Sequence, residues 1–211
     1  MHITKEDLIT MHRIDRLNLI NSLSGIKPAN LIGSVDAEGN ENLGIFSSVV
    51  HLGSNPALFG FILRPRGEVR RHTHENILAT GVYTINFVHT HFTKQAHYTS
   101  IKAEAGTSEF DLSGLTSEYL SGFEAPFVKE STIKLGMSFH QEVPIEANGT
   151  SLIIGQVEHI LLPDGTMADG GHLDLGKLGV AGISGLNTYY SLQKEARYPY
   201  VRDEFGLEDL G

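Results

Sequence analysis

The spacing of hydrophobic and polar positions changes several times along the chain. Between Glu6 and Leu23, apolar residues recur every three or four positions, which predicts one helix that Gly25 and Pro28 end. Further along, apolar runs and alternations bounded by turn residues predict strands. The predicted strands span residues 29–35, 43–50, 58–63, 82–88, 133–143 and 151–162. Two short helices are predicted between strands, at residues 73–80 and 93–100.

The order of these elements favours an antiparallel barrel with peripheral helices. A doubly wound parallel sheet needs a full helix in each crossover, and most of these connections are too short to hold one. A hairpin signal at Asn148-Gly149, between the two longest strands, agrees with antiparallel pairing. We therefore expect a mainly β fold in a single domain over residues 1–211. Its expected parts are an N-terminal helix at about 6–24, a barrel at about 28–185 and a C-terminal tail at 186–211.

Composition and charge exclude several classes of protein. The chain has 16 basic and 25 acidic residues, for a net charge of −9, so neither nucleic acid nor an anionic membrane is an expected partner. It has no cysteine, which excludes disulfides, thiolate nucleophiles and Cys-based metal sites. The N-terminus lacks the apolar centre of a secretory signal, and a cytoplasmic location is expected. Basic residues gather in one place, at Arg64, Arg66, Arg70 and Arg71.

This basic cluster lies close to consecutive hydroxyl residues and a predicted helix start. Ser47 and Ser48 end a predicted strand, and Arg71 and Thr73 begin a predicted helix. A helix N-terminus, a guanidinium and a hydroxyl are all donors that suit a phosphate monoester. The alternative is that the arginines are solvated and that Thr73 is only an N-cap. Arg64 would add a further positive charge.

Asn30 is a polar residue on an otherwise apolar predicted strand. An unpaired buried amide is costly, so Asn30 needs a partner. Two interpretations remain open at this point. Its amide pairs with nearby backbone, or it donates to the polar edge of a ligand.

Two His-x-His pairs suggest a metal site of the cupin type. The pairs are His72/His74 and His89/His91. The cupin pattern requires strand histidines with a Glu four or five residues further on. Here Glu75 follows the first pair directly, and on a helix the two rings would point about 200° apart. We therefore expect no metal ligand, although a metal-dependent cupin-like enzyme is kept as a competing hypothesis.

Taken together, several ordered segments resemble the flavin reductase-like, FMN-binding split-barrel family. The resemblance runs from about residue 22 to residue 192. It is carried by SLSGIKPANLIGSVDAEGNENLGIFSSV, by RHTHENI at 71–77, by SEFDLSGLT at 108–116 and by APFVKES at 125–131. The resemblance implies an antiparallel split β-barrel.

The resemblance also implies a cofactor site and an oligomer. It implies a homodimer with FMN near the subunit interface, and FAD is a possible replacement. It implies that Ser47, Ser48, Arg71 and Thr73 hold the flavin phosphate and that Asn30 lies close to the ring system.

Some positions depart from the family pattern or match it loosely. Arg71 replaces the family's usual Lys and keeps the charge, whereas His72 replaces the usual Asp and removes an expected helix cap. Arg64 is carried over on a looser match. Tyr189 and Tyr190 are either contacts to the flavin from the tail or surface residues.

The implied reaction is hydride transfer from NADH or NADPH to the flavin, followed by transfer to a small-molecule acceptor. This step requires no side-chain acid or base, so no catalytic residue is assigned. Residues 101–131, rich in Ser, Gly and Glu, are expected to be irregular and to border the acceptor site as a mobile cover. The alternative function is an FMN-binding electron carrier without its own NAD(P)H turnover.

Overall fold

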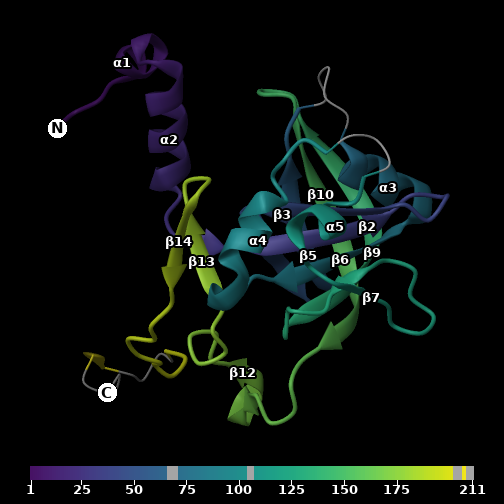
Figure 1. Cartoon of the computed structure of the whole chain (residues 1–211). Helices are drawn as coiled ribbons and strands as arrows, with labels where there is room; N and C mark the ends of the chain where they lie inside the picture. The colour runs from purple at the N-terminus through teal and green to yellow at the C-terminus, as the bar shows by residue number, and fades with distance from the viewer. Residues whose placement is uncertain (66–70, 104–106, 202–205, 208–211) are drawn as a thin grey trace.

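Seven antiparallel strands form the main sheet of the molecule (Figure 1). The computed structural model describes residues 1–65, 71–103, 107–201 and 206–207. In the order in which they pair, the strands are β3 (Glu41–Phe46), β2 (Asn30–Val35), β6 (Val82–Phe87), β9 (Lys134–Ile145), β10 (Thr150–Leu161), β5 (Ala57–Leu63) and β4 (Val50–Ser54). Each neighbouring pair is antiparallel. The expected mainly β, antiparallel fold is confirmed.

The sheet closes because its two edge strands are neighbours in sequence. Only residues 47–49 connect β3 at one edge to β4 at the other. Seven strands laid flat would hold their edges about 29 Å apart, whereas the chain from Phe46 to Val50 reaches about 14 Å at most. The sheet must therefore curl until its edges approach each other, which makes it a barrel.

A side chain in this crossing ties it to the barrel. The Ser48 hydroxyl accepts a hydrogen bond from the Ile62 N–H of β5 at 3.0 Å. Ser48 thereby continues the β4–β5 pairing past the end of β4. The prediction of one strand at 43–50 is wrong for this reason, because the chain leaves one edge at Ser47 and joins the other at Val50.

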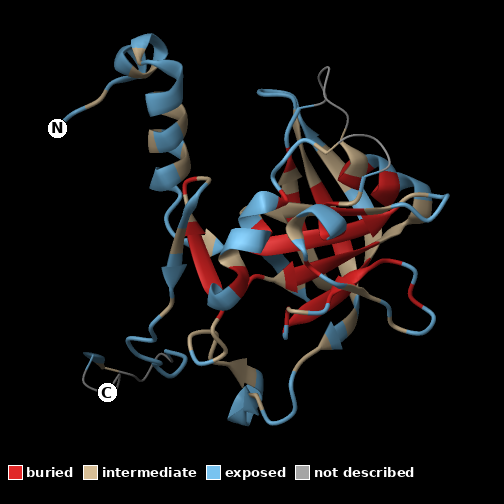
Figure 2. Cartoon of the chain, viewed as in Figure 1, coloured by how far each residue is buried: buried red, intermediate tan, exposed pale blue. Residues whose placement is uncertain are grey.

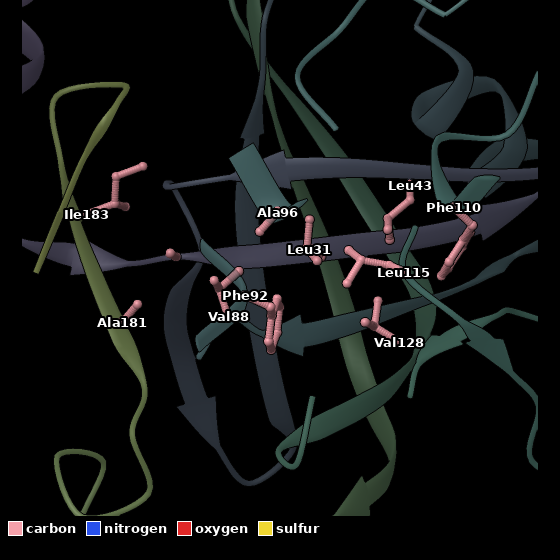
Figure 3. Close-up of a cluster of buried hydrophobic side chains, with 11 residues drawn as sticks. Leu31, Leu43, Val88, Phe92, Ala96, Phe110, Leu115, Val128, Ala181 and Ile183 are labelled. Atoms are coloured by element: carbon pink, nitrogen blue, oxygen red, sulfur yellow. The ribbon is translucent and has the colours of Figure 1, made fainter. Parts of the chain in front are cut away.

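Buried apolar side chains gather on both faces of the sheet. Leu31 and Ile32 of β2 belong to different clusters because successive side chains of a strand point to opposite faces. The interior cluster contains Ile32, Val49, Phe61, Leu63, Ile77, Tyr83, Ile85, Leu135, Met137 and Ile153. The outer cluster contains Ala29, Leu31, Leu43, Val88, Phe92, Ala96, Phe110, Leu115, Val128, Ala181 and Ile183 (Figure 3). In Figure 2 the buried positions concentrate in the strands of the barrel.

Short helices cover the barrel. They are α3 (His72–Thr80), the 3-10 turn η1 (Thr90–Phe92), α4 (Thr93–Tyr98) and α5 (Glu109–Ser113). α3 contributes Ile77 to the interior cluster and ends at Gly81, whose φ of 74° suits glycine. The helices predicted at 73–80 and 93–100 are thus present, and each of their ends lies within two residues of the predicted position.

The stretch from 101 to 131 is more ordered than predicted. Besides α5 it contains β7 (Ser117–Glu118), which pairs with β8 (Phe127–Val128). Phe110 and Val128 are buried in the outer cluster, and Phe123 anchors a smaller cluster with Ala125 and Phe127. Outside these three short elements the described residues of the stretch have no helix or strand, as predicted. Its buried side chains argue against a freely mobile cover.

The N-terminal residues form two helices instead of the predicted one. These are α1 (Lys5–Thr10) and α2 (Arg13–Leu23), with the break at Met11 and His12. The Arg16 guanidinium reaches back and donates to the Leu8 carbonyl of α1 at 3.0 Å, which satisfies an acceptor that the break exposes. Neither helix has a buried residue, and both project from the barrel (Figures 1 and 2). We call α1 and α2 together the N-terminal arm.

The C-terminal part adds a smaller sheet beside the barrel. It consists of β1 (Lys27–Pro28), β13 (Ala181–Ser184) and β14 (Thr188–Ser191). A further short hairpin pairs β11 (Met167–Ala168) with β12 (His172–Leu173) across the 3-10 turn η2 (Asp169–Gly171). No helix in the described part of the chain is long and apolar enough to span a membrane.

His89 ties the C-terminal part to the barrel. Its Nδ1 lies 2.9 Å from the Leu178 carbonyl oxygen, and its Nε2 accepts from the Thr132 N–H at 3.1 Å. A carbonyl can only accept and a backbone N–H can only donate, so this ring is neutral with its proton on Nδ1. Burial lowers the pKa of His89 and favours the same neutral form.

Glu109 of α5 covers the open edge of β3. Its carboxylate accepts from the Leu43 N–H at 3.0 Å, at an edge where no further strand of the described residues pairs with β3. The side chain is buried, and this burial raises the pKa of Glu109, opposed by the hydrogen bond from Leu43 and by the charge of His72. The buried environment of Glu109 thus favours the neutral carboxylic acid over the ionised carboxylate.

The free energy of unfolding of Glu109→Gln, relative to that of wild type, is expected to be higher at pH 8 than at pH 4. The raised pKa means that the folded state binds the proton more tightly than the unfolded state. Wild-type stability is therefore lost as pH rises from about 4.5 through the folded-state pKa. Glu109→Gln keeps an oxygen acceptor for Leu43 and removes this loss. Urea unfolding of both proteins at pH 4, 6 and 8 measures the difference.

The matched control is Asp111→Asn, which removes a carboxylate charge from an exposed position of the same helix. Its difference from wild type is expected to change little with pH. A Glu109→Gln difference that stays constant from pH 4 to pH 8 would show that burial of this carboxylate does not govern its protonation.

Candidate functional site

The N-terminus of α3 presents donors that the protein itself does not use. α3 begins at His72, and Arg71 is its N-cap without a side-chain cap hydrogen bond. The first N–H groups of a helix have no intrahelical acceptor and carry partial positive charge, so this end attracts an anion. The Nε of Arg71 is buried and has no hydrogen-bond partner in the described structure. The alternative in which Thr73 serves as the N-cap is wrong, because Thr73 is the second residue of the helix.

Thr73 is buried against strand β3. Its Oγ1 accepts from the side-chain amide of Asn42 at 2.9 Å. Asn42 also approaches the Ser34 hydroxyl at 3.4 Å, and Asn76 donates to the same hydroxyl at 3.2 Å. These four buried side chains, from β2, β3 and α3, form one polar network between the helix and the sheet.

Ser47 and Ser48 lie where the barrel closes, and their hydroxyls differ in use. The Ser48 hydroxyl is engaged with the backbone of Ile62, as described above. The Ser47 hydroxyl makes no hydrogen bond in the described part of the chain and remains available. Arg64 is exposed and follows Leu63, the last residue of β5, two positions after Ile62. The crossing therefore brings Arg64 to the same end of the barrel as the two serines.

Asn30 begins β2 and is fully buried. It pairs with Phe46 of β3 on one side and with Phe87 of β6 on the other, so it lies one residue from Ser47 across the sheet. Neither its amide nitrogen nor its amide oxygen has a hydrogen-bond partner in the described structure. The interpretation that Asn30 is satisfied by nearby backbone is therefore wrong. A ligand that contacted its amide would first have to displace a covering side chain.

Other polar candidates from the sequence are engaged elsewhere. The Tyr189 hydroxyl lies 3.1 Å from Nδ1 of His97, and burial raises the pKa of Tyr189 to about 12. Tyr190 is 39% exposed on β14. His74 pairs with Glu142 at 3.0 Å, on a helix as expected. Among the described residues, no group of three or more His, Cys, Asp or Glu side chains is placed to hold a metal ion.

Two cavities lie apart from these residues. One of about 410 Å³ lies beside α3, and one of about 630 Å³ lies between the β2–β3 turn and Tyr119. None of Asn30, Ser47, Ser48, Arg64, Arg71 and Thr73 lines either cavity. Arg66 and Arg70 of the basic cluster lie outside the described residues.

Glu109 and Asn42 were not singled out in the sequence, yet they contact the elements that carry this site. Ser108 directly before Glu109, and Gly114 five residues after Glu109, are a helix start and stop signal that could have placed Glu109 on a helix. For Asn42, the alternation of apolar and polar residues along β3 could predict which face of the sheet it lies on, but not its hydrogen bond to Thr73.

Comparison with known proteins identifies the family. The family model of the flavin reductase like domain matches residues 26–174. A split-barrel protein from Shewanella frigidimarina NCIMB 400, assigned as a flavin reductase, is 46% identical, with a TM-score of 0.92 over 95% of this chain and 100% of that chain. No curated protein sequence matches the chain.

Two more distant structures share the fold. Component B of nitrilotriacetate monooxygenase from Bacillus cereus is 18% identical, with a TM-score of 0.81 over 93% of this chain and 98% of that chain. An NADH:FAD oxidoreductase from Streptomyces globisporus is 10% identical, with a TM-score of 0.67 over 92% and 98%. The expected split-barrel architecture is confirmed, and this chain belongs to the flavin reductase-like family.

Proposed function

We propose that this protein binds FMN and transfers a hydride from NADH or NADPH to it, and from it to a second acceptor. The observation that supports this most directly is the N-terminus of α3. There a buried guanidinium nitrogen of Arg71 has no partner among the described residues, and it lies beside the first N–H groups of the helix and the Thr73 hydroxyl. Unpaired buried donors are costly, and a phosphate monoester would satisfy them together. Because the chain belongs to the flavin reductase-like family, we propose that this anion is the phosphate of FMN.

The predicted site residues would have different roles around the proposed cofactor. Arg71 and Thr73 would hold the phosphate, with the available Ser47 hydroxyl on the adjoining crossing. Ser48 would contribute by fixing that crossing to β5, since its hydroxyl is occupied by Ile62. Arg64 would add positive charge at the same end of the barrel.

Asn30 would meet the ring system. Its amide has one acceptor and two donor positions without partners, and these match the mixed polar edge of a flavin. When bound, the flavin supplies the hydride-accepting centre. The protein would bind the phosphate and orient the ring, and no side chain is required to move a proton in the hydride step.

The purified protein is expected to carry a flavin absorption band, and the chromophore released by heat is expected to be FMN. Anaerobic stopped-flow mixing with NADH or NADPH is expected to bleach this band rapidly. Reduction only by a partner protein would instead indicate an electron carrier. A colourless protein with stoichiometric metal and no affinity for FMN would contradict the proposal and support the cupin-like alternative.

Arg71→Ala is expected to weaken FMN binding by about 1.5–3 kcal/mol, the range of a charge-assisted hydrogen bond. Thr73→Val is expected to weaken it less, because a neutral hydroxyl donor is removed. Fluorescence titration with FMN measures both losses. Arg197→Ala removes the same charge from an exposed position in the tail and is the control. Equal losses for Arg71→Ala and Arg197→Ala would mean that only overall charge matters.

We also propose that two copies of the chain form a homodimer through the N-terminal arm. The arm leaves Ile9, Ile14, Ile20 and Leu23 between 46% and 72% exposed. Isolated helices as short as α2 are marginal in water, so this helix needs packing that a single chain does not provide. The arm has three basic and three acidic residues, so its own charge is zero and it can approach a second acidic chain without net repulsion.

Light scattering on the wild-type protein is expected to give about twice the 23.1 kDa mass of one chain. The double variant Ile20→Ser/Leu23→Ser is expected to lower this mass towards one chain at micromolar concentration, because two apolar contacts are lost. Ile160→Ser, at a comparably exposed isoleucine on the barrel, is the control. A double variant that keeps the wild-type mass would remove the arm from the interface.

A further inference from the structure

The Thr73 hydroxyl has an unused proton in a buried position. The side chain is 8% exposed, and its Oγ1 accepts one hydrogen bond, from Asn42 at 2.9 Å. A hydroxyl has one donor position besides its acceptor positions, and in the described structure this donor meets no acceptor. Because Asn42 approaches with an N–H group, the hydroxyl proton must point away from it. The direction in which Thr73 can donate is thus set by Asn42.

Asn42 is itself held in place by its neighbours and by burial. It lies on β3 opposite Ser34 of β2, and its amide nitrogen approaches the Ser34 hydroxyl at 3.4 Å. The next residue, Leu43, is fixed at the sheet edge by its N–H bond to the buried Glu109. The Asn42 side chain is 8% exposed, so it has little freedom to reorient.

The residue of β3 beside the Thr73 hydroxyl is a glycine, Gly44. A Cβ at Gly44, two residues after Asn42 on the same face of β3, would lie 3.6 Å from Thr73 Oγ1 and 3.2 Å from the Phe46 ring. A side chain there would fill the volume next to the hydroxyl. Asn42 and Gly44 therefore both affect Thr73 Oγ1. Asn42 sets the direction of its hydroxyl proton, and Gly44 places no side chain against it.

We infer that Asn42 is a positioning residue for phosphate recognition: its amide N–H turns the Thr73 hydroxyl so that the proton is offered to an oxygen of the bound phosphate. This inference rests on the proposed function. Asn42 would touch no ligand atom and would act only through Thr73. A purely structural role, in which the network of Ser34, Asn42, Thr73 and Asn76 merely packs α3 on the sheet, makes a different prediction, because Asn76 would then matter equally.

The test compares FMN with riboflavin, which lacks the phosphate. Asn42→Leu is expected to weaken FMN binding about 5- to 30-fold, the range for loss of one hydrogen bond at a buried site. Riboflavin binding is expected to stay within about 2-fold of wild type. In a Thr73→Val background the same substitution is expected to change FMN binding by less than about 2-fold, since the hydroxyl it orients is already absent. Fluorescence titration gives all the affinities without turnover.

The matched control is Asn76→Leu, which removes an amide of the same network that is bonded to Ser34 and not to the Thr73 hydroxyl. Circular dichroism establishes that each variant is folded, and Asn42→Ser, too short to reach Thr73, replaces Asn42→Leu if that variant does not fold. Equal losses for Asn42→Leu and Asn76→Leu, equal losses for FMN and riboflavin, or unchanged FMN binding in Asn42→Leu would each overturn the inference. A wild-type protein that binds neither FMN nor inorganic phosphate would instead overturn the proposed function.

Discussion

The three-residue crossing between β3 and β4 is the constraint on which the rest of the structure depends. Because residues 47–49 join the two edges of a seven-stranded sheet, the sheet has to close, and the interior cluster forms inside it. The same crossing brings Ser47 next to Asn30 across the sheet and ties Ser48 to β5 just before Arg64. The proposed site is therefore a consequence of closure. A barrel closed by a longer loop would lose the geometry that gathers these groups.

The buried polar groups of β2, β3 and α3 are of two kinds: some are bonded to one another, and others have no partner in the described structure. Ser34, Asn42 and Asn76 are buried and bonded to one another or to Thr73, so they fix α3 against the sheet. The amide of Asn30 and the Nε of Arg71 are buried and have no hydrogen-bond partner among the described residues. Orphaned groups of this kind lower stability, and they persist where a ligand satisfies them. The satisfied network thus holds the unsatisfied donors in position.

The sequence predicted the regular parts of the fold and missed the places where one contact overrides local pattern. Strong apolar alternation located the strands, and Gly81 located the end of α3. The break before Arg13 has no glycine or proline to signal it, and it depends on Arg16 bonding the α1 carbonyls. The crossing did carry a signal, since two serines followed by two valines interrupt the alternation of β3. The pairing of Glu109 with Leu43 spans 66 residues, and no local pattern encodes it.

Local geometry, rather than net charge, decides where this acidic molecule can hold an anion. The cavity of about 410 Å³ beside α3 is lined by Asp36, Glu38, Glu41, Glu75 and Glu109, together with His72. Carboxylates grouped in this way repel a phosphate, and in a partly dehydrated cavity the repulsion is stronger than in water. The opposite is true at the end of α3, where Arg71, the helix N–H groups and the Thr73 hydroxyl all donate. An anionic ligand would therefore be favoured on the Arg71 side of this helix over the neighbouring acidic cavity.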